Sequence, residues 1–217
     1  MKNRKRMRAE LRDRPPKFEV RAINPGSVEI RALPEDEGGG AIIWGLAIPY
    51  NCESEEMYGF REIVAPGAFK ESLGGDIRCL WNHETGKPLG RTTNGTLTLR
   101  DAQEGLAYEC KLPDTSWGKD AKESISRGDV TGMSFGFIVR RDDWAYPKDS
   151  DVVVRTILEA ELFEVSPVTF PAYPDSVTEA RSKLLEEGTK KALESREVPL
   201  SIYEKRLQLQ KMIGGIN

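Results

Sequence analysis

Short apolar runs separated by turn residues dominate the chain from residue 18 to residue 170, and this pattern predicts a β-rich domain. The runs SVEIRAL (27–33) and AIIWGLAI (41–48) flank an acidic, glycine-rich turn and are expected to pair as a hairpin. Further strands are expected at IRCLWN (77–82), GTLTLRD (95–101), GLAYECKL (105–112), a run opening at residue 132, and VVVRTILEAELFEVSPVTF (152–170).

The sequence predicts fewer helices than strands in this region. DTSWGKDAKESISRGD (114–129) predicts a helix that Asp114 or Thr115 can cap and that Gly128 ends, and AFKESL (68–73) predicts a shorter one. The polar segment RRDDWAYPKDSD (140–151) is expected to be an excursion between strands. The predicted organisation is a disordered basic arm (1–17), a β-rich domain (18–176) and a charged helical extension (177–217).

Charge distinguishes the first residues from the rest. Residues 1–17 hold eight Lys or Arg and two acids, which leaves 24 basic against 33 acidic residues in the remainder. Such an arm either binds an acidic partner or is a solvated leader. Nucleic-acid binding through this arm is the weaker alternative, because no aromatic platform or second basic stripe accompanies it.

Composition also indicates which cellular compartment and which cofactors to expect. No apolar run approaches the roughly 20 residues that cross a bilayer, and no apolar segment follows the basic start as in a secretory signal. Three widely spaced cysteines, Cys52, Cys79 and Cys110, fit reduced thiols in a cytoplasm. Because the chain has a single histidine, we expect no metal site, and nothing indicates another cofactor.

The segment RGDVTGMSFGF (127–137) contains the first candidate for chemistry. In a strand, alternation places Met133, Phe135, Phe137 and Val139 on one face, and Gly132, Ser134 and Gly136 on the other. The cleared space beside the Ser134 hydroxyl has two interpretations. The glycines can mark a bulge or a close backbone contact, with the serine incidental, or they can give a substrate access to a nucleophile.

Two further residues could complete a catalytic set with Ser134. His83 follows an apolar strand and enters a Gly/Pro-containing loop, where it would be both oriented and accessible. Alternation in ILEAELFEVSPV places Glu164 on the apolar face of Leu162, and a carboxylate there needs a cation or strong donors. Glu164 is therefore the expected partner of His83, and the opposite-face residues Glu159 and Glu161 are rivals if the register slips.

Cys79 is the other residue that could pair with His83, which lies four positions later. Along one strand the two residues share a face but stand more than about 10 Å apart, at a rise of about 3.3 Å per residue. The spacing therefore favours Cys79 as a core residue.

Four segments together resemble one known family, the prohead (capsid-maturation) proteases of tailed bacteriophages. They are APGAFKESL, LWNHETGKPLGRT, LPDTSWGKDAKESISRGDVTGMSFGF and ELFEVSPVTFPAYPDS, and the resemblance covers roughly residues 28–176. The family is similar in fold to herpesvirus assemblins, which implies a closed β-barrel ringed by a few helices.

The resemblance implies a nucleophile at Ser134, in GMSFGF, and a general base at His83, in WNH. The third position is less settled, because assemblins use a second histidine and this chain has none. The choice of Glu164, in LFEVSP, as the third member depends as much on its place on the strand face as on the resemblance.

The resemblance further implies a serine endopeptidase that cleaves the scaffolding segment of the major capsid protein, and itself, inside a procapsid in the bacterial host cytoplasm. Whether it forms a homo-oligomer is open at this stage. A non-enzymatic alternative is a capsid-assembly or scaffolding module that retains the fold, with Ser134 as a relic.

Overall fold

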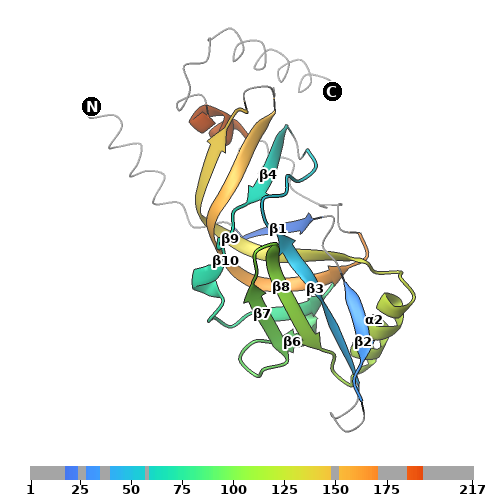
Figure 1. The fold of residues 1–217 in the computed structure, drawn as a ribbon. Helices are drawn as coiled ribbons and strands as arrows, with labels where there is room; N and C mark the ends of the chain where they lie inside the picture. The colour runs from blue at the N-terminus through green and yellow to red at the C-terminus, as the bar shows by residue number, and fades with distance from the viewer. Residues whose placement is uncertain are drawn as a thin grey trace.

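The structure is a computed structural model that describes residues 18–23, 28–34, 40–56, 59–147, 152–170 and 185–192. Its strands form two sheets (Figure 1). The first contains β1 (Phe18–Ile23), β9 (Gly132–Ala145), β10 (Val153–Val168), β5 (Arg78–Trp81) and β6 (Glu84–Arg91) in that order, with β4 (Phe60–Val64) beside β10. The second contains β2 (Glu29–Ala32), β3 (Ala41–Pro49), β8 (Gly105–Lys111) and β7 (Leu97–Asp101). No helix in these ranges is long and apolar enough to cross a membrane.

The two sheets bury their apolar residues in one shared core. Met133, Phe135 and Phe137 are fully buried there, as alternation predicts, and Val139 packs against the same cluster. Phe69 meets the rings of Phe135 and Phe137 edge-on at centroid distances of 5.9 and 6.0 Å. The apolar face of β9 therefore anchors the strand that carries Ser134.

The expected hairpin and the main helix are confirmed. β2 pairs antiparallel with β3, and α2 (Ser116–Ser126) follows the predicted cap. The Thr115 hydroxyl, rather than Asp114, accepts the bond from the Gly118 N–H at 3.2 Å. Gly128 has a φ of +79°, the left-handed conformation with which helices commonly end.

Three local expectations are wrong. The segment after His83 is not a loop but strand β6, and AFKESL yields only the single 3-10 turn η2 (Lys70–Ser72). The polar segment after residue 139 is not an excursion, because β9 continues to Ala145. Its charges are compatible with a strand because β10 lies alongside and supplies opposite charges, as between Asp142 and Arg155.

The closed barrel is not confirmed, since the described strands form two sheets rather than one continuous ladder. β6 passes close to β8 without pairing with it. A Cβ at Gly90 would stand 2.5 Å from Cys110 Sγ, yet the ladders between the described strands include none that joins β6 to β8.

β10 is the central strand of the first sheet. It pairs antiparallel with β9 along its length and parallel with β4 and then β5 on its other side. Toward the upper end in Figure 1, where β9 and β10 project beyond the second sheet, the segment 185–192 forms a helix. A second small core of Phe60, Trp144, Val153 and Ala192 lies there.

The predicted extension therefore has at least one part that packs on the β-rich domain, because Ala192 is fully buried in that second core. The expected arm (1–17) and the rest of 177–217 lie outside the described residues.

We predict that Gly188→Ala destabilises the protein. A Cβ at Gly188 would stand 2.2 Å from two Trp144 ring carbons, and such overpacking costs about 1–3 kcal/mol. Thermal unfolding of the full chain measures the effect. Gly74→Ala is the control, since no atom lies within 4 Å of its added Cβ. A Gly188→Ala chain as stable as the wild type would show that this helix does not pack on Trp144, because alanine itself favours helix.

Candidate functional site

His83 and Glu164, which are 81 residues apart, meet in the structure. His83 Nδ1 lies 2.8 Å from Glu164 Oε1, and the two side chains are 32% and 8% exposed. An ionised carboxylate only accepts hydrogen bonds, so this contact requires a proton on Nδ1, and in the neutral imidazole Nε2 is then an acceptor. The Ser166 hydroxyl donates to the other carboxylate oxygen at 2.5 Å. Each oxygen of the Glu164 carboxylate therefore has its own hydrogen-bond partner.

A strained turn orients the histidine. Asn82 and His83 form the two-residue connection between β5 and β6, with φ of 48° and 62°. This turn favours Asn followed by Gly, and a left-handed non-glycine residue costs roughly 1–2 kcal/mol. Asn82 is tied to the end of β10: its N–H donates to Pro167 O at 3.2 Å, and its Oδ1 accepts from Thr169 N at 3.0 Å. The hairpin tip is thus fixed on the strand that carries Glu164.

Glu164 lies on the opposite sheet face from the one that simple alternation predicts. Leu162 and Glu164 pair with adjacent residues of β9, so Phe163 is an extra residue, a β-bulge. Leu162 belongs to the core, whereas Glu164 beyond the bulge pairs with Gly136 and shares its face with Ser134. The strand-face argument therefore selected Glu164 on an incorrect register, and the bulge directs it toward His83.

Gly136 explains part of the cleared face around Ser134. A Cβ at this position would stand 2.6 Å from Glu164 Oε1 and 2.4 Å from Phe18 Cζ. Because an added Cβ would displace both side-chain atoms, glycine is required for the Glu164 carboxylate and the Phe18 ring to lie where they do. Gly136 thus marks a close approach of side chains, rather than the close backbone contact that the sequence suggested.

Ser134 is buried rather than open to solvent, which corrects the expected access. It is 1% exposed, and its hydroxyl donates to the Arg21 carbonyl at 2.9 Å. Strand β1 covers it, with Ala22 paired directly to Ser134. In the described part of the chain, Ser134 makes no hydrogen bond with His83. The strand order β1-β9-β10-β5 instead places β10, with Ser166 paired to Ser134, between them.

The two rival glutamates lie elsewhere. Glu159 and Glu161 are 48% and 40% exposed and pair with Arg141 and Arg140 at the surface. Neither has a contact with His83 among the described residues.

Cys79 is a core residue, as its spacing from His83 indicates, and is fully buried beside Cys110. A hydrogen bond with Cys110 and burial raise the pKa of the Cys79 thiol, which disfavours the nucleophilic thiolate. No group of three or more His, Cys, Asp or Glu within the described ranges is placed to hold a metal ion.

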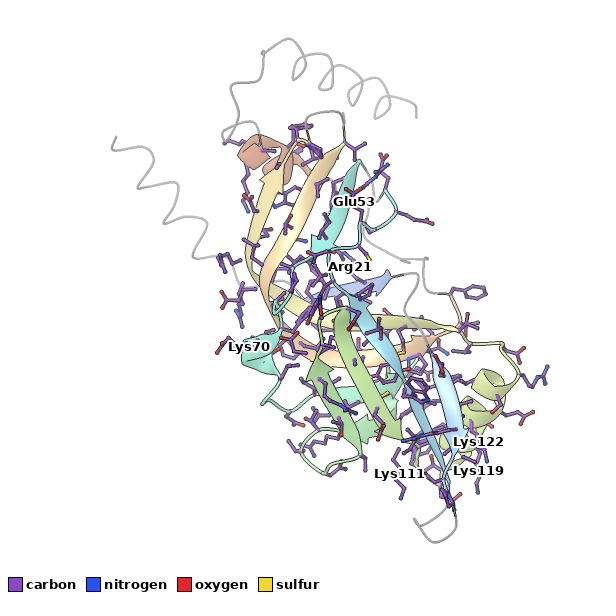
Figure 2. All side chains as sticks on the ribbon, in the orientation of Figure 1. Arg21, Glu53, Lys70, Lys111, Lys119 and Lys122 are labelled. Carbon is purple, nitrogen blue, oxygen red and sulfur yellow. The ribbon has the colours of Figure 1, made fainter. Side chains whose placement is uncertain are left out.

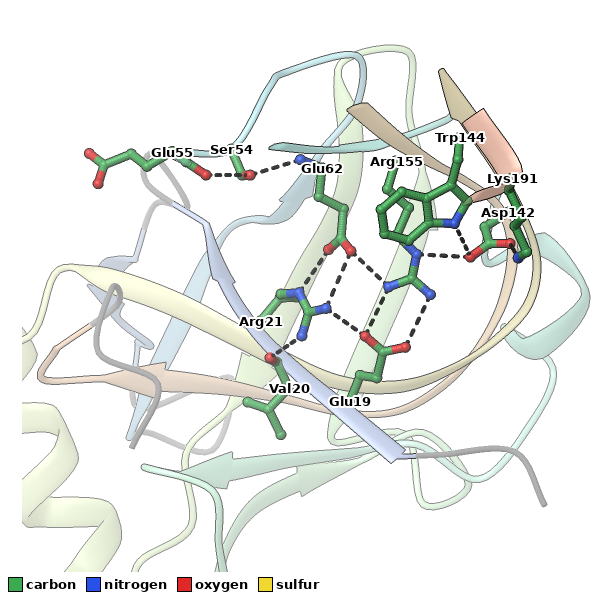
Figure 3. A network of polar contacts seen from close by, with 10 residues as sticks. All are labelled: Glu19, Val20, Arg21, Ser54, Glu55, Glu62, Asp142, Trp144, Arg155 and Lys191. Carbon is green, nitrogen blue, oxygen red and sulfur yellow. Dashed lines mark hydrogen bonds and ion pairs between the residues drawn. The ribbon is translucent and has the colours of Figure 1, made fainter. Parts of the chain in front are cut away.

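A buried ion cluster, which the sequence analysis missed, lies where β1, β4, β9 and β10 meet (Figure 3). Its members are Glu19, Arg21, Glu62, Asp142, Arg155 and Lys191. Arg155 contacts all three carboxylates, each at a nearest N···O distance of 3.0 Å. Arg21 Nε donates to Glu62 Oε1 at 2.8 Å. The sequence signal was the presence of charges inside apolar runs: Arg155 alone in VVVRTIL, and Arg61 with Glu62 in FREIV.

Mutual attraction outweighs desolvation in this cluster. Burial acts to raise the pKa of Glu19, but Arg155 and Arg21 together hold it below the usual value. Burial likewise acts to lower the pKa of Arg155, and the surrounding carboxylates raise it. Three acids and three bases make up the cluster, so its formal charges balance.

A hollow of about 850 Å³ lies away from Ser134, between β6, β8 and α2. Basic residues distant in sequence gather around it: Arg78, Arg91, Lys111, Lys119 and Lys122. Figure 2 shows the three lysines together at one end of the molecule. Because this hollow contains neither His83 nor Glu164, it is separate from the candidate catalytic residues.

A family model and a curated relative agree on one family. A model of caudovirus prohead serine proteases matches residues 27–191. The prohead protease of Enterobacteria phage HK97 is 34% identical over 158 residues, which are 70% of this chain and 64% of that protein. The chain thus spans less than two thirds of that relative's length. The structure of the bacteriophage T4 capsid assembly protease, gp21, has a TM-score of 0.47 at 10% identity, covering 70% of this chain and 99% of that one.

We predict that Gly136→Ala breaks the contact between His83 and Glu164. The new methyl group needs the space of Glu164 Oε1, so the carboxylate must move. The chain has one histidine, so its ring ¹⁵N shifts report directly whether Nδ1 keeps its proton. Gly86→Ala on β6 is the control, because its Cβ meets no atom within 4 Å. Unchanged His83 shifts in Gly136→Ala would contradict this account of the glycine.

The ion cluster predicts an acid limit of stability. Because the pKa of Glu19 is lowered in the folded state, its contribution is fully present above the ordinary value of 4.5 and is lost as pH falls through the lowered value. Glu19→Gln should therefore lower Tm at pH 7 and reduce the further loss of Tm between pH 5 and pH 3. Glu29→Gln, at an exposed position of β2, is the control. Equal acid sensitivity of Glu19→Gln and the wild type would exclude this role.

Proposed function

Because the chain belongs to the caudovirus prohead serine protease family, we propose that it is a serine endopeptidase that cleaves the scaffolding segment of the major capsid protein, and itself, during procapsid maturation. In this proposal Ser134 is the nucleophile, His83 the general base and Glu164 the residue that orients the base. The observation that carries it is the 2.8 Å contact between His83 Nδ1 and Glu164 Oε1 beside the face of Ser134.

Each residue has a defined role. Glu164 fixes the tautomer of His83 and stabilises the imidazolium that forms during the reaction. Nε2 of His83 takes the hydroxyl proton as Ser134 attacks the scissile carbonyl, and returns it to the leaving amine. Water then hydrolyses the acyl-enzyme by the same route. Ser166 helps to fix the orientation of the Glu164 carboxylate, because its hydroxyl donates to Glu164 Oε2.

The reaction requires at least one rearrangement. The Ser134 hydroxyl donates to Arg21 O and must turn away from this carbonyl before it can donate to His83. This turn requires no movement of the apolar face of β9, since Ser134 and the core residue Phe135 point in opposite directions.

We predict that Ser134→Ala abolishes cleavage of a co-expressed major capsid protein and labelling by a serine-reactive phosphonate. Only one hydroxyl is removed, so the fold should persist. Intact mass of the capsid protein and peptide mapping of the probe are the measurements. Ser166→Ala is the matched control: it should slow cleavage without abolishing it, because Ser166 touches Glu164 rather than the substrate.

Glu164→Gln should reduce turnover by orders of magnitude, roughly 10⁴-fold where an orienting carboxylate has been replaced in a comparable triad. Glu159→Gln and Glu161→Gln should stay near wild type, since both carboxylates lie at the surface.

Full cleavage by the Ser134→Ala variant would exclude Ser134 as the nucleophile. A folded wild-type chain that neither cleaves nor takes up the probe would favour the non-catalytic assembly module.

A further inference from the structure

The edge of the strand that carries Ser134 is already occupied by a peptide segment. Strand β1 pairs antiparallel with β9, from Phe18 opposite Ile138 to Ile23 opposite Met133. The segment precedes the region matched by the family model, which begins at residue 27. Extended peptides commonly bind proteins in this way, by adding a strand to a sheet edge.

The register places one peptide bond of β1 against the hydroxyl of Ser134. The Arg21 carbonyl oxygen lies 2.9 Å from Ser134 Oγ, and Ala22 pairs with Ser134. A scissile carbonyl must come within such reach of a serine nucleophile. The Arg21–Ala22 bond therefore stands where the proposed protease would hold the bond to be cut.

Among the described side chains of β1 (Phe18–Arg21), charge contacts rather than core packing accompany the backbone pairing. Phe18 and Val20 are 49% and 37% exposed, and neither is in a core cluster. Arg21, by contrast, is 8% exposed: its Nε and Nη2 lie 2.8 and 3.3 Å from the Glu62 carboxylate, and its guanidinium stands over the Phe137 ring at 5.7 Å. Two residues earlier, Glu19 accepts from Arg155 at 3.0 and 3.1 Å.

The charge balance makes β1 replaceable. Glu19 and Arg21 carry opposite charges, so their departure leaves Glu62 and Asp142 balanced by Arg155 and Lys191. No buried charge is left without a partner, which is the usual large cost of breaking such a cluster. Another extended peptide with the same pair of charges could take the place of β1.

We propose that the edge of β9 from Gly132 to Ile138 is the substrate-binding strand, and that Glu62 and Arg155 determine its specificity. They select a peptide with a basic residue immediately before the scissile bond and an acidic residue two positions earlier. β1 occupies this site in cis and competes with other substrates. This inference rests on the proposed proteolytic function and adds the class of peptide to it.

The chemical step balances with water as the only co-reactant. Ser134 Oγ bonds to the carbonyl carbon of the basic residue while its proton passes to His83. The peptide C–N bond then breaks as that proton moves to the leaving nitrogen. Water hydrolyses the ester, restores Ser134 and releases the carboxyl product.

The test uses full-length Ser134→Ala chains, which cannot turn over, and a fluorescent peptide of residues 16–27, PKFEVRAINPGS. Arg21→Glu in the chain places three carboxylates together and should eject β1. Fluorescence anisotropy should then show peptide binding at least tenfold tighter than to Ser134→Ala alone. Arg31→Glu is the matched control: this exposed arginine on β2 pairs with Glu109 and lies outside the ion cluster, so affinity should not change.

A charge swap tests Glu62 directly. Glu62→Arg should also eject β1, through repulsion from Arg21, and the emptied site should bind the peptide with Glu in place of Arg at least tenfold better than the original peptide. The double variant Arg21→Glu with Glu62→Arg should re-dock β1 and bind neither peptide tightly. Circular dichroism confirms folding. If Arg21→Glu does not fold, the Glu62→Arg and Arg21→Gln variants take its place, and their peptide affinity is compared with that of Ser134→Ala alone.

The results separate this inference from the proposed function. Charge-matched binding, with no cleavage when Ser134 is present, would support the binding site and refute the protease. Cleavage without any preference between the Arg and Glu peptides would refute the inference alone. Equal peptide affinity across folded Arg21→Glu, Arg31→Glu and Ser134→Ala chains would also overturn it.

Discussion

One extra residue in the longest strand pair of the molecule determines the geometry of the candidate site. The bulge at Phe163 reverses the faces of β10, so that Leu162 enters the core and Glu164 lies on the side of Ser134. Without this insertion the carboxylate would be directed into the core, where it would lack the His83 and Ser166 contacts that it has here. Bulges beside active sites re-aim side chains in this way.

The residues around the bulge are constrained to preserve its geometry. Gly136 is bare because the carboxylate fills the space that a Cβ would need. His83 takes a left-handed turn conformation that would suit glycine better, and Asn82 holds that turn against the end of β10. Local strain and missing side-chain volume both cost stability, and both occur at the residues that approach Glu164. Such strain persists where the surrounding contacts over-determine the local conformation.

The ion cluster connects this site to the rest of the chain. Arg155 joins β1, β4 and β9 through one guanidinium, and Asp142 extends the cluster to Lys191 of the 185–192 helix. Removing one member of such a buried set costs about 3–5 kcal/mol when a charge is left alone, whereas removing a balanced pair avoids that cost. The cluster therefore holds the first sheet together and still allows a charged strand to be exchanged at its edge.

Much of the fold followed from the sequence, and so did the choice of Ser134 and His83 as candidates. Period-two alternation located the paired strands, because one face of each is buried, and the capping pattern located α2. Ser134 and His83 stood out because a lone hydroxyl on a bare strand face and a lone histidine are local features. Polar strands were missed, as in β6 and the end of β9, because partner strands rather than the strands' own apolar residues stabilise them.

The tertiary structure alone determined which groups meet. Alternation cannot reveal a bulge, so the face of Glu164 became evident only when β10 was paired with β9. The hydrogen bond of Ser134 depends on β1, whose Arg21 carbonyl accepts it from more than 100 residues earlier in the chain. The cluster around Arg155 likewise draws on four strands and a helix. Sequence encodes the local preferences of each segment, but register and long-range pairing depend on the free energy of the assembled sheet, which no single segment contains.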